Sequence, residues 1–289
     1  NTCASGDGNC IFNATEFQTV VDNNPQYSAT QLLGFFNEWY RVDGGTAVTS
    51  AATNATSDWI TALNNFQDSG VVVFASGNST YENDVSATAA LPEWFPQLAE
   101  AWISVGMIDF TGDNISDATE SEFTLHGNKC GTAKEYCVVA DGYELNGGWY
   151  TDDTYSYYKA NGSGSSYSAP MISGGIALMA QAFPNHTPEQ LTDRLLASSN
   201  NDWFTAEGTT TFTTHGNSVT HGYHSTWGQG IPDFYAAMSP ITSNANPALS
   251  LYTGNSIQTS RPISLESSYI TSSSSFGDSL SLGLIGESG

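Results

Sequence analysis

Apolar side chains recur at helical spacing in two stretches near the start of the chain. Residues 13–24 and residues 49–68 each place them three or four positions apart, which predicts two amphipathic helices. The apolar residues are Phe17, Val20 and Val21 in the first stretch, and Trp59, Ile60, Leu63 and Phe66 in the second. Between them, Gln31 to Tyr40 is apolar and aromatic, and its pattern fits a buried strand or a short helix equally well.

Three short apolar runs predict strands. Val71–Ala75 is a β-branched run bounded by glycine, which predicts a fully buried strand, and Trp102–Met107 and Tyr136–Ala140 are predicted as two further strands. The first of them follows the predicted helix 49–68 after a short turn at Ser69-Gly70, as in the second half of a parallel crossover unit. The fold class that we predict is therefore α/β, with a parallel sheet flanked by helices. Residues 109–128 are polar and read as a loop, and residues 141–160 read as a turn-rich aromatic surface.

The second half of the chain is organised around Asn161–Phe183, a small, polar turn followed by an apolar stretch long enough for a helix. Pro170 is expected in the first turn of that helix. Thr187, Pro188 and Gln190 form a capping-box pattern before another helix. A β-hairpin over 200–225 and a short helix within 227–238 are expected to close the domain. From Ser239 the composition shifts to Ser, Thr, Asn and Pro, so we assign 1–240 to one domain and 241–289 to an extension or linker.

The charge balance excludes one class of partner. The chain of 289 residues has 29 acidic and 6 basic side chains, a formal net charge of −23. Nucleic acid is excluded because phosphate binding needs Lys and Arg. The many carboxylates could hold Ca²⁺, although no ordered calcium-binding loop is found and no cofactor is required. No apolar run reaches a membrane span, and the absence of an initial Met and of a signal peptide indicates a processed product or a fragment.

Four cysteines fall in two local pairs, Cys3/Cys10 and Cys130/Cys137. Short loops and an even count favour two disulfides, Cys3–Cys10 and Cys130–Cys137, in an oxidising, extracytoplasmic compartment. A zinc site with ligands from both pairs is the alternative, but the spacing is wider than zinc motifs use.

Ser166 lies at the mouth of the helix predicted after the Gly/Ser turn. A serine there is held by a rigid element, and the N–H groups of the first helical turn have no intrahelical partners. The helix dipole also favours negative charge at that point. These are the requirements of a serine nucleophile whose substrate becomes an oxyanion, although a Ser-rich turn that merely caps a buried helix has the same pattern.

Asn78 is a second candidate, because it directly follows the predicted strand 71–75. Ligands of open parallel sheets bind beyond the carboxyl ends of the strands. The side-chain amide of Asn78 is a neutral donor that can face a developing oxyanion. The alternative is that Asn78 only terminates the strand, a role that is common for Asn.

Both candidates lie in motifs that resemble those of subtilisin-like serine peptidases. Gly164-Ser-Ser-Tyr-Ser-Ala-Pro170 resembles the G-T-S-M-A-A-P motif, which implies that Ser166 is the nucleophile. Ala75-Ser76-Gly77-Asn78 resembles A-A-G-N, which implies that Asn78 is the oxyanion-hole donor, a donor whose loss costs roughly 10²–10³ in turnover in subtilisin itself. The resemblance extends over nearly the whole chain and is closest to the passenger domains of bacterial autotransporter subtilases. The further blocks that carry it are Cys3…Gly8-Asn-Cys10, Ala90-Leu-Pro…Phe95-Pro, Asn128-Lys-Cys130…Tyr136-Cys137-Val-Val-Ala, Gln181-Ala-Phe-Pro184 and Gly222-Tyr223…Gly228-Gln-Gly230.

The family's catalytic Asp and His motifs are missing, so the resemblance implies a partial domain without its N-terminal part. All five histidines are expected to be surface or loop residues, with metal ligation by His221 and His224 as the alternative, and none is assigned as general base. The family also has a strand ending in N-x-S-W/L-G along the substrate cleft. We compare it with Asn37-Glu-Trp-Tyr-Arg41, and on this resemblance we assign Gly77, Gly164 and Arg41 to the cleft.

The sequence supports two hypotheses about function. The first is a serine endopeptidase that hydrolyses polypeptides through an acyl-enzyme. It is not active as this chain alone, and it takes Asp and His from a preceding segment or a separate chain. The second is a catalytically inactive subtilisin-like surface or assembly protein, in which the aromatic stretch Trp149–Tyr158 and the Ser/Thr-rich tail make contacts. In both, the protein is secreted or at a bacterial cell surface, with self-assembly or a downstream outer-membrane barrel as further expectations.

Overall fold

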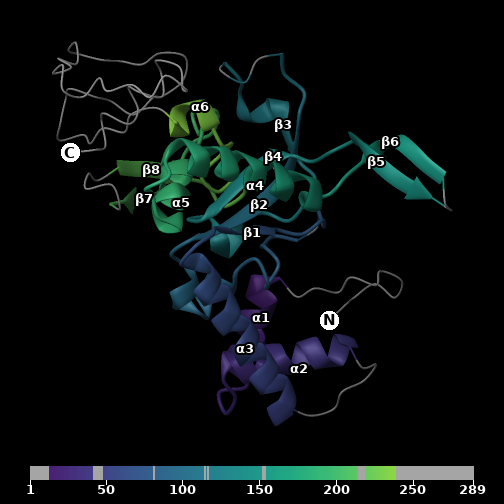
Figure 1. Cartoon of the computed structure of the whole chain (residues 1–289), viewed down its shortest axis with the longest axis vertical. Coiled ribbons are helices and arrows are strands. Elements are labelled where there is room, and N and C mark those ends of the chain that lie inside the picture. Colours follow the sequence, from purple (N-terminus) through teal and green to yellow (C-terminus); the bar gives the residue numbers. More distant parts are fainter. Residues whose placement is uncertain are drawn as a thin grey trace.

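The computed structural model has mixed α/β architecture, in which a small sheet lies between two layers of helices (Figure 1). It describes residues 13–41, 48–80, 82–113, 115, 117–151, 154–213 and 219–238, with the side chains of 38–41, 146–151 and 154–161 outside that description. Within these residues, no helix has the length and apolar character that crossing a membrane requires.

The central sheet is built on strand β2 (Trp102–Phe110). Strands β1 (Val72–Ala75) and β4 (Cys137–Asp141) pair with it in parallel on opposite edges, since Val105 is opposite both Ala75 and Val138. The last residues of β2 pair antiparallel with the short β3 (Phe123–Leu125). The first seven residues of β2 are all buried, as expected for a strand covered on both faces.

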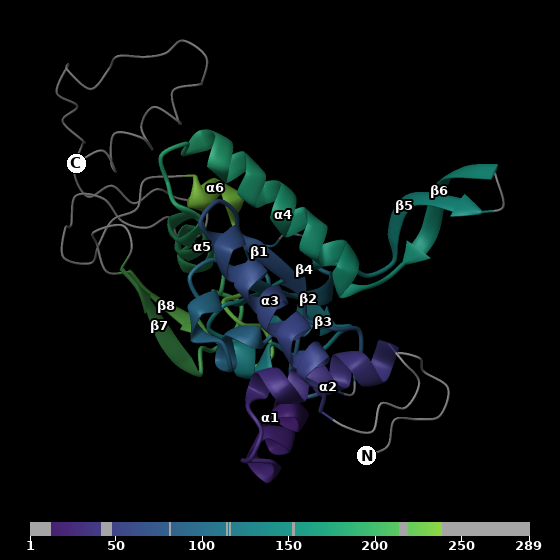
Figure 2. The same ribbon diagram turned by 60° about the horizontal axis from the view of Figure 1, so that its bottom comes forward.

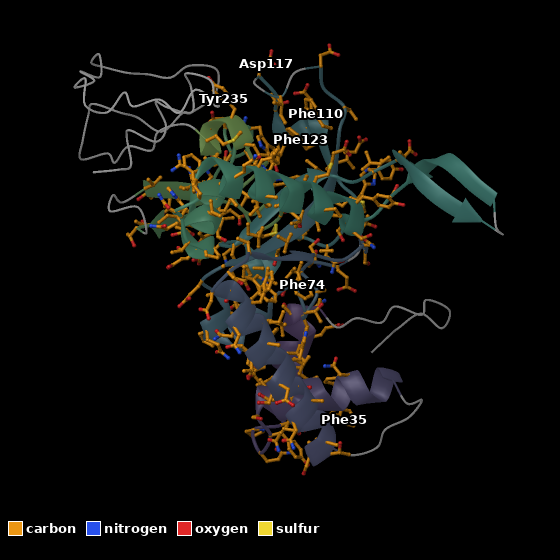
Figure 3. The ribbon with its side chains drawn as sticks, viewed as in Figure 1. Phe35, Phe74, Phe110, Asp117, Phe123 and Tyr235 are labelled. Carbon is orange, nitrogen blue, oxygen red and sulfur yellow. A yellow bond between two sulfur atoms is a disulfide. The ribbon has the colours of Figure 1, made fainter. Side chains whose placement is uncertain are left out.

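Three helices that precede the sheet in the sequence pack together on one side of it (Figure 2). These are α1 (Ala14–Asn23), α2 (Ala29–Arg41) and α3 (Ser50–Gln67). Their apolar residues, among them Phe17, Leu33 and Ile60, form one cluster with Trp102 of β2. Phe74 of β1, labelled in Figure 3 at the junction of sheet and helices, stacks on Trp102 with ring centroids 4.8 Å apart.

The other face is covered by α4 (Ser165–Ala182) and α5 (Pro188–Ala197). Ile172, Ile176 and Met179 of α4 pack on Ile103 and Val105 of β2. Helix α5 begins with the predicted capping box, in which Thr187 and Gln190 exchange hydrogen bonds between side chain and backbone. The chain then forms a hairpin of β7 (Gly208–Phe212) and β8 (Val219–Tyr223), and ends its described part with α6 (Phe234–Ala237).

Strands β5 (Leu145–Thr151) and β6 (Thr154–Gly162) form a second antiparallel hairpin, which projects away from the sheet (Figure 1). Its backbone leads directly into the Gly/Ser turn before α4. The aromatic side chains predicted to form a surface here, Trp149–Tyr158, lie outside the described side chains.

The structure decides or corrects several sequence predictions. Gln31 to Tyr40 belongs to helix α2, and the stretch 109–128 contains strand β3 as well as loops. Phe66, predicted in an apolar stripe, is 52% exposed. Helix α4 begins at Ser165, earlier than predicted, so Pro170 lies in its second turn. Residues 239–289 are outside the described part, and the boundary near 240 stays a prediction.

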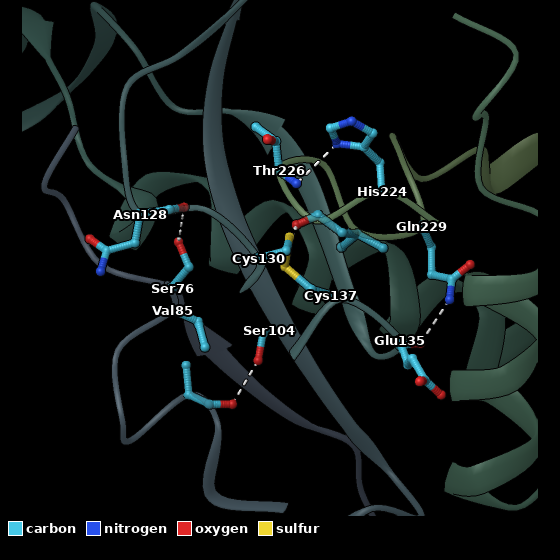
Figure 4. Close-up of a disulfide and its surroundings, with 12 residues drawn as sticks. Ser76, Val85, Ser104, Asn128, Cys130, Glu135, Cys137, His224, Thr226 and Gln229 are labelled. Carbon is cyan, nitrogen blue, oxygen red and sulfur yellow. Dashed lines mark hydrogen bonds between the residues drawn. A yellow bond between two sulfur atoms is a disulfide. The ribbon is translucent and has the colours of Figure 1, made fainter. Parts of the chain in front are cut away.

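The predicted disulfide Cys130–Cys137 is present (Figure 4). It closes the loop between β3 and β4, and both cysteines are fully buried. Because these two sulfur atoms are bonded to each other, they are not available as zinc ligands. Cys3 and Cys10 lie outside the described residues.

Candidate functional site

The carboxyl ends of β1 and β4 meet the start of α4, and this junction places Asn78 beside Ser166. The Gly164 N–H donates to the Gly142 carbonyl at 2.9 Å, just beyond β4. The buried Ser168 hydroxyl donates to the Ala140 carbonyl at 3.1 Å. The first turn of α4 is therefore attached to the end of the sheet, while Ser166 itself is exposed.

Ser165, a buried residue, determines how the Asn78 amide is oriented. The Ser165 backbone N–H donates to Asn78 Oδ1 at 2.7 Å, and the Ser165 hydroxyl lies 2.8 Å from the same oxygen. A backbone N–H can only donate, so the oxygen of the amide must be on this side. The Asn78 Nδ2 group consequently points away from Ser165.

Gly164 separates Asn78 Nδ2 from the Ser166 hydroxyl. A Cβ at position 164 would stand 3.0 Å from Ser166 Oγ and 3.6 Å from Asn78 Nδ2, so both atoms border the same small space. The Ser166 N–H belongs to the first turn of α4 and has no hydrogen-bond acceptor in the part of the chain that is described. A negatively charged oxygen in this space would meet a side-chain amide, a backbone N–H and the positive end of a helix dipole.

Sequence reasoning missed two of the residues that shape this junction, Ser165 and Asn128. Ser165 contacts Asn78, as described above, and Asn128 contacts the loop around it, residues 76–79. Both are distant from Asn78 in sequence. Ser165 lies inside the motif Gly164–Pro170, and Asn128 begins the block Asn128-Lys-Cys130, but neither motif indicates what these side chains contact.

No general base is found beside Ser166 among the described residues. His126 stacks on Tyr143 with ring centroids 3.5 Å apart, and His224 accepts from the Thr226 N–H at 3.0 Å. None of the four described histidines makes a hydrogen bond to Ser166. His215 lies outside the described residues.

The prediction that every histidine is a surface or loop residue is wrong for His221. It lies on strand β8 and is only 8% exposed. Its ring nitrogens lie 2.7 Å from Gln229 Oε1 and 2.8 Å from the Ser199 carbonyl. Burial lowers the pKa of this imidazole, while its two hydrogen bonds act in the opposite direction.

The comparison of residues 37–41 with a strand end is also wrong, because these residues are the last ones of helix α2. The basis for assigning Arg41 to a substrate cleft is thereby lost, and the Arg41 side chain lies outside the described part. Gly77 and Gly164, in contrast, both lie at the junction. Gly77 has φ +119°, a conformation that favours glycine, and its carbonyl accepts from the Asn128 N–H at 3.1 Å.

Comparison with known proteins supplies a family. A sequence model of the subtilase family matches residues 12–230. "Serotype-specific antigen 1" of Mannheimia haemolytica is 30% identical over 131 residues, which are 45% of this chain and 13% of that protein. "Extracellular serine protease" of Serratia marcescens is 27% identical over 139 residues, 42% of this chain and 12% of that protein. The matched region thus spans about an eighth of the length of these relatives.

Comparison with solved structures gives weaker matches. Fervidolysin from Fervidobacterium pennivorans, described as a keratinolytic enzyme related to subtilisin, is 20% identical, with 69% of this chain and 30% of that chain covered and a TM-score of 0.42. MycP1 from Mycobacterium smegmatis is 18% identical, with 75% and 51% covered and a TM-score of 0.39. These scores are low, so the family assignment rests on the sequence match.

Proposed function

The chain belongs to the subtilase family, and from that premise we propose that it is the nucleophile-bearing part of a serine endopeptidase. Ser166 is the nucleophile, and Asn78 Nδ2 together with the Ser166 N–H forms the oxyanion hole. One observation carries the proposal. Ser165 fixes the oxygen of the Asn78 amide, which turns its nitrogen toward the space beside Ser166 Oγ.

The proposed reaction is peptide-bond hydrolysis in two steps. Ser166 Oγ attacks the carbonyl carbon, its proton passes to an imidazole, and the carbonyl oxygen becomes an anion between the two donors. The C–N bond then breaks, and the leaving amine takes the proton from the imidazolium. Water attacks the resulting ester by the same route and releases the acid and the free Ser166 hydroxyl.

The imidazole and its orienting carboxylate come, in this proposal, from a preceding segment or a separate chain. Two surfaces that nothing in the described part of the chain covers, the outer edge of β1 and the outward face of α4, support such a partner. The N–H groups of Val72 and Ser76 donate to the carbonyls of Ala101 and Val105, on the side of β2. Because successive residues of a strand point their N–H and C=O groups to opposite sides, those of Val73 and Ala75 face away from β2, and no described strand pairs with them there.

The second surface is the outward face of α4. Met171 and Leu178 are 44% and 58% exposed, and a Cβ on Gly174, between them on the same face, would meet no atom within 4 Å. A segment that adds a parallel strand to β1 and an apolar helix along α4 would cover both surfaces and bring its side chains toward the start of α4.

Labelling with a biotinylated fluorophosphonate, followed by peptide mapping, tests the proposal on the native material. We expect the label on Ser166, its loss in Ser166→Ala, and its retention in Ser163→Ala, a matched change in the same turn. A second polypeptide with the Asp and His motifs, or a longer chain that contains them, is expected in the same preparation. Folded material without label and without such a segment would refute the proposal.

The alternative, an inactive surface or assembly protein, is favoured by one observation, the lack of a described histidine at Ser166. In that case Ser166 stays unlabelled even when the Asp- and His-bearing segment is present. The same experiment therefore separates the two functions.

An extracytoplasmic location is part of the proposal in either case. The Cys130–Cys137 disulfide supports an oxidising compartment. The similarity to an "Extracellular serine protease" points the same way.

A further inference from the structure

Asn128 contacts the loop around Asn78 without contacting Asn78 itself. It is 5% exposed and lies between β3 and β4, and its backbone N–H donates to the Gly77 carbonyl at 3.1 Å. Its Oδ1 accepts from the Ser79 N–H at 3.0 Å, and its carbonyl lies 3.4 Å from the Ser76 hydroxyl, which donates to it (Figure 4). Asn128 therefore bonds to the residues on both sides of Asn78.

The remaining hydrogen bond of Asn128 fixes its own amide. Asn128 Nδ2 donates to the Asp84 carbonyl at 2.9 Å. The carboxylate of Asp84 accepts from the N–H and the hydroxyl of Thr132, inside the loop closed by the Cys130–Cys137 disulfide. Through Asp84, the Asn128 side chain is thus connected to the disulfide-closed loop as well as to the loop 76–79.

Close packing limits the loop further. The Asn128 side chain lies directly against the Cα of Gly77, where any Cβ would collide with it, and Gly127 is packed on the Gly77 carbonyl. Ser165 bonds to the loop on one side and Asn128 on the other. Asn78, at the loop's exposed tip, has its position set by these two contacts.

We propose that Asn128 is a positioning residue that holds the loop 76–79 so that Asn78 Nδ2 faces the oxyanion. This inference rests on the proposed function, since it concerns the same site. Without the Asn128 amide, the Ser79 N–H loses its acceptor, and on this side the loop keeps only the backbone bonds of residue 128 to Gly77 and Ser76. A displacement of about 1 Å in a catalytic group can cost on the order of 100-fold in rate.

The test is a double-mutant cycle on the enzyme together with the segment that supplies its Asp and His, with a chromogenic peptide as substrate. Asn128→Ala is expected to lower kcat by roughly 10- to 100-fold and to leave KM within about twofold. In an Asn78→Ala background the same change is expected to lower kcat by less than about twofold, because Asn128 acts through Asn78.

Gln67→Ala is the matched control for a loss of buried hydrogen bonding. Gln67 is 6% exposed, and its amide donates to the Leu98 carbonyl at 2.7 Å, away from the site. It is expected to lower stability and to leave kcat unchanged. If Asn128→Ala lowers kcat equally with and without the Asn78 amide, the inference is overturned.

Amide hydrogen exchange of the same variants separates this inference from the proposed function. We expect the Ser79 amide, bonded to Asn128 Oδ1, and the Gly77 amide, bonded to Ser165 Oγ, to exchange faster in Asn128→Ala than in Gln67→Ala, even where the wild type neither cleaves peptide nor takes the fluorophosphonate label. In that case the proposed function fails while the positioning of the loop is supported. Equal exchange in the two variants contradicts the positioning, whatever the activity.

Discussion

Asp84 joins three distant segments through one buried carboxylate. It is 3% exposed and makes five hydrogen bonds with donors of the protein. Oδ1 accepts from the Val85 and Thr132 N–H groups, at 2.9 and 2.7 Å. Oδ2 accepts from the Thr15 N–H at 2.9 Å and from the hydroxyls of Thr15 and Thr132, at 2.6 and 2.7 Å.

Asp84→Ala removes every acceptor and leaves these donors without their partner in the protein. Three of them are backbone N–H groups, each worth about 1–3 kcal/mol when it is left without a partner. Partial rearrangement lowers the sum, so we expect a loss of roughly 3–5 kcal/mol in the free energy of unfolding.

Asp84→Asn is expected to cost less, because its amide has one favourable orientation. When the amide oxygen takes the place of Oδ1, it still accepts from the N–H groups of Val85 and Thr132. The NH₂ group then faces the Thr15 N–H and the hydroxyls of Thr15 and Thr132, and the hydroxyls can rotate to accept from it. Only the Thr15 N–H then lacks an acceptor, and the expected loss is about 1–3 kcal/mol.

Urea unfolding measures both changes, and hydrogen exchange identifies the unpaired group. The Thr15 amide is expected to exchange faster in Asp84→Asn, while the Val85 and Thr132 amides stay protected. Asp58→Asn, a change at an exposed carboxylate on α3, is the control and is expected to stay within about 0.5 kcal/mol of wild type. Equal losses for Asn and Ala, or an unprotected Thr132 amide, would refute this reasoning.

Three further predictions concern the site, the disulfide and pH. Gly164→Ala places a methyl group 3.0 Å from Ser166 Oγ, and it should slow fluorophosphonate labelling by at least roughly 100-fold; an unchanged rate would show that the oxyanion does not occupy this space. Replacing both Cys130 and Cys137 by Ser should lower the free energy of unfolding in urea by about 2–3 kcal/mol, given their sequence separation of 7, and a change below about 0.5 kcal/mol would contradict this. Burial lowers the pKa of His221 from its ordinary value of 6.5. Just below pH 6.5 the unfolded chain therefore binds more protons than the folded chain does. The stability that is present above pH 6.5 is lost as the pH falls toward the pKa of the folded state. His221→Gln should therefore flatten the fall in unfolding free energy between about pH 7.5 and 5.5, and an unchanged slope would mean that other groups cause it.

Local patterns predicted the secondary structure well where one rule dominated. The strand at 71–75, the helix at 49–68 and the capping box at Thr187 each depend on neighbouring residues, and each is present. The stretch 31–40 was ambiguous because it is apolar on most sides, and packing of α2 on α3 decided it: a Cβ on Gly34 would stand 2.8 Å from the Ala52 carbonyl. The comparison of Asn37–Arg41 with a strand end failed because it matched a few residue types to a motif, although the residues before them do not have the apolar pattern of a strand.

The site was predicted in part. Asn78 and Ser166 stand next to recognisable strand and helix signals, so their meeting at the end of the sheet follows from topology. Ser165 and Asn128 act through contacts between residues 49 to 88 positions apart in the sequence, which no local pattern records. His221 was misjudged for a related reason, since only the folded hairpin shows that it faces Gln229 and Ser199.

The shared carboxylate of Asp84 sets an order for folding during synthesis. The Thr15 N–H in the first turn of α1 obtains its acceptor only when Asp84, 69 residues later in the chain, has left the ribosome. Asp84 in turn is complete only after Thr132, another 48 residues on. The hydrogen bonds that join α1 to Asp84 and Thr132 therefore cannot all form until these later segments have been synthesised. A chaperone that keeps the first turn of α1 apart from the later segments would, until then, oppose none of the hydrogen bonds to Asp84.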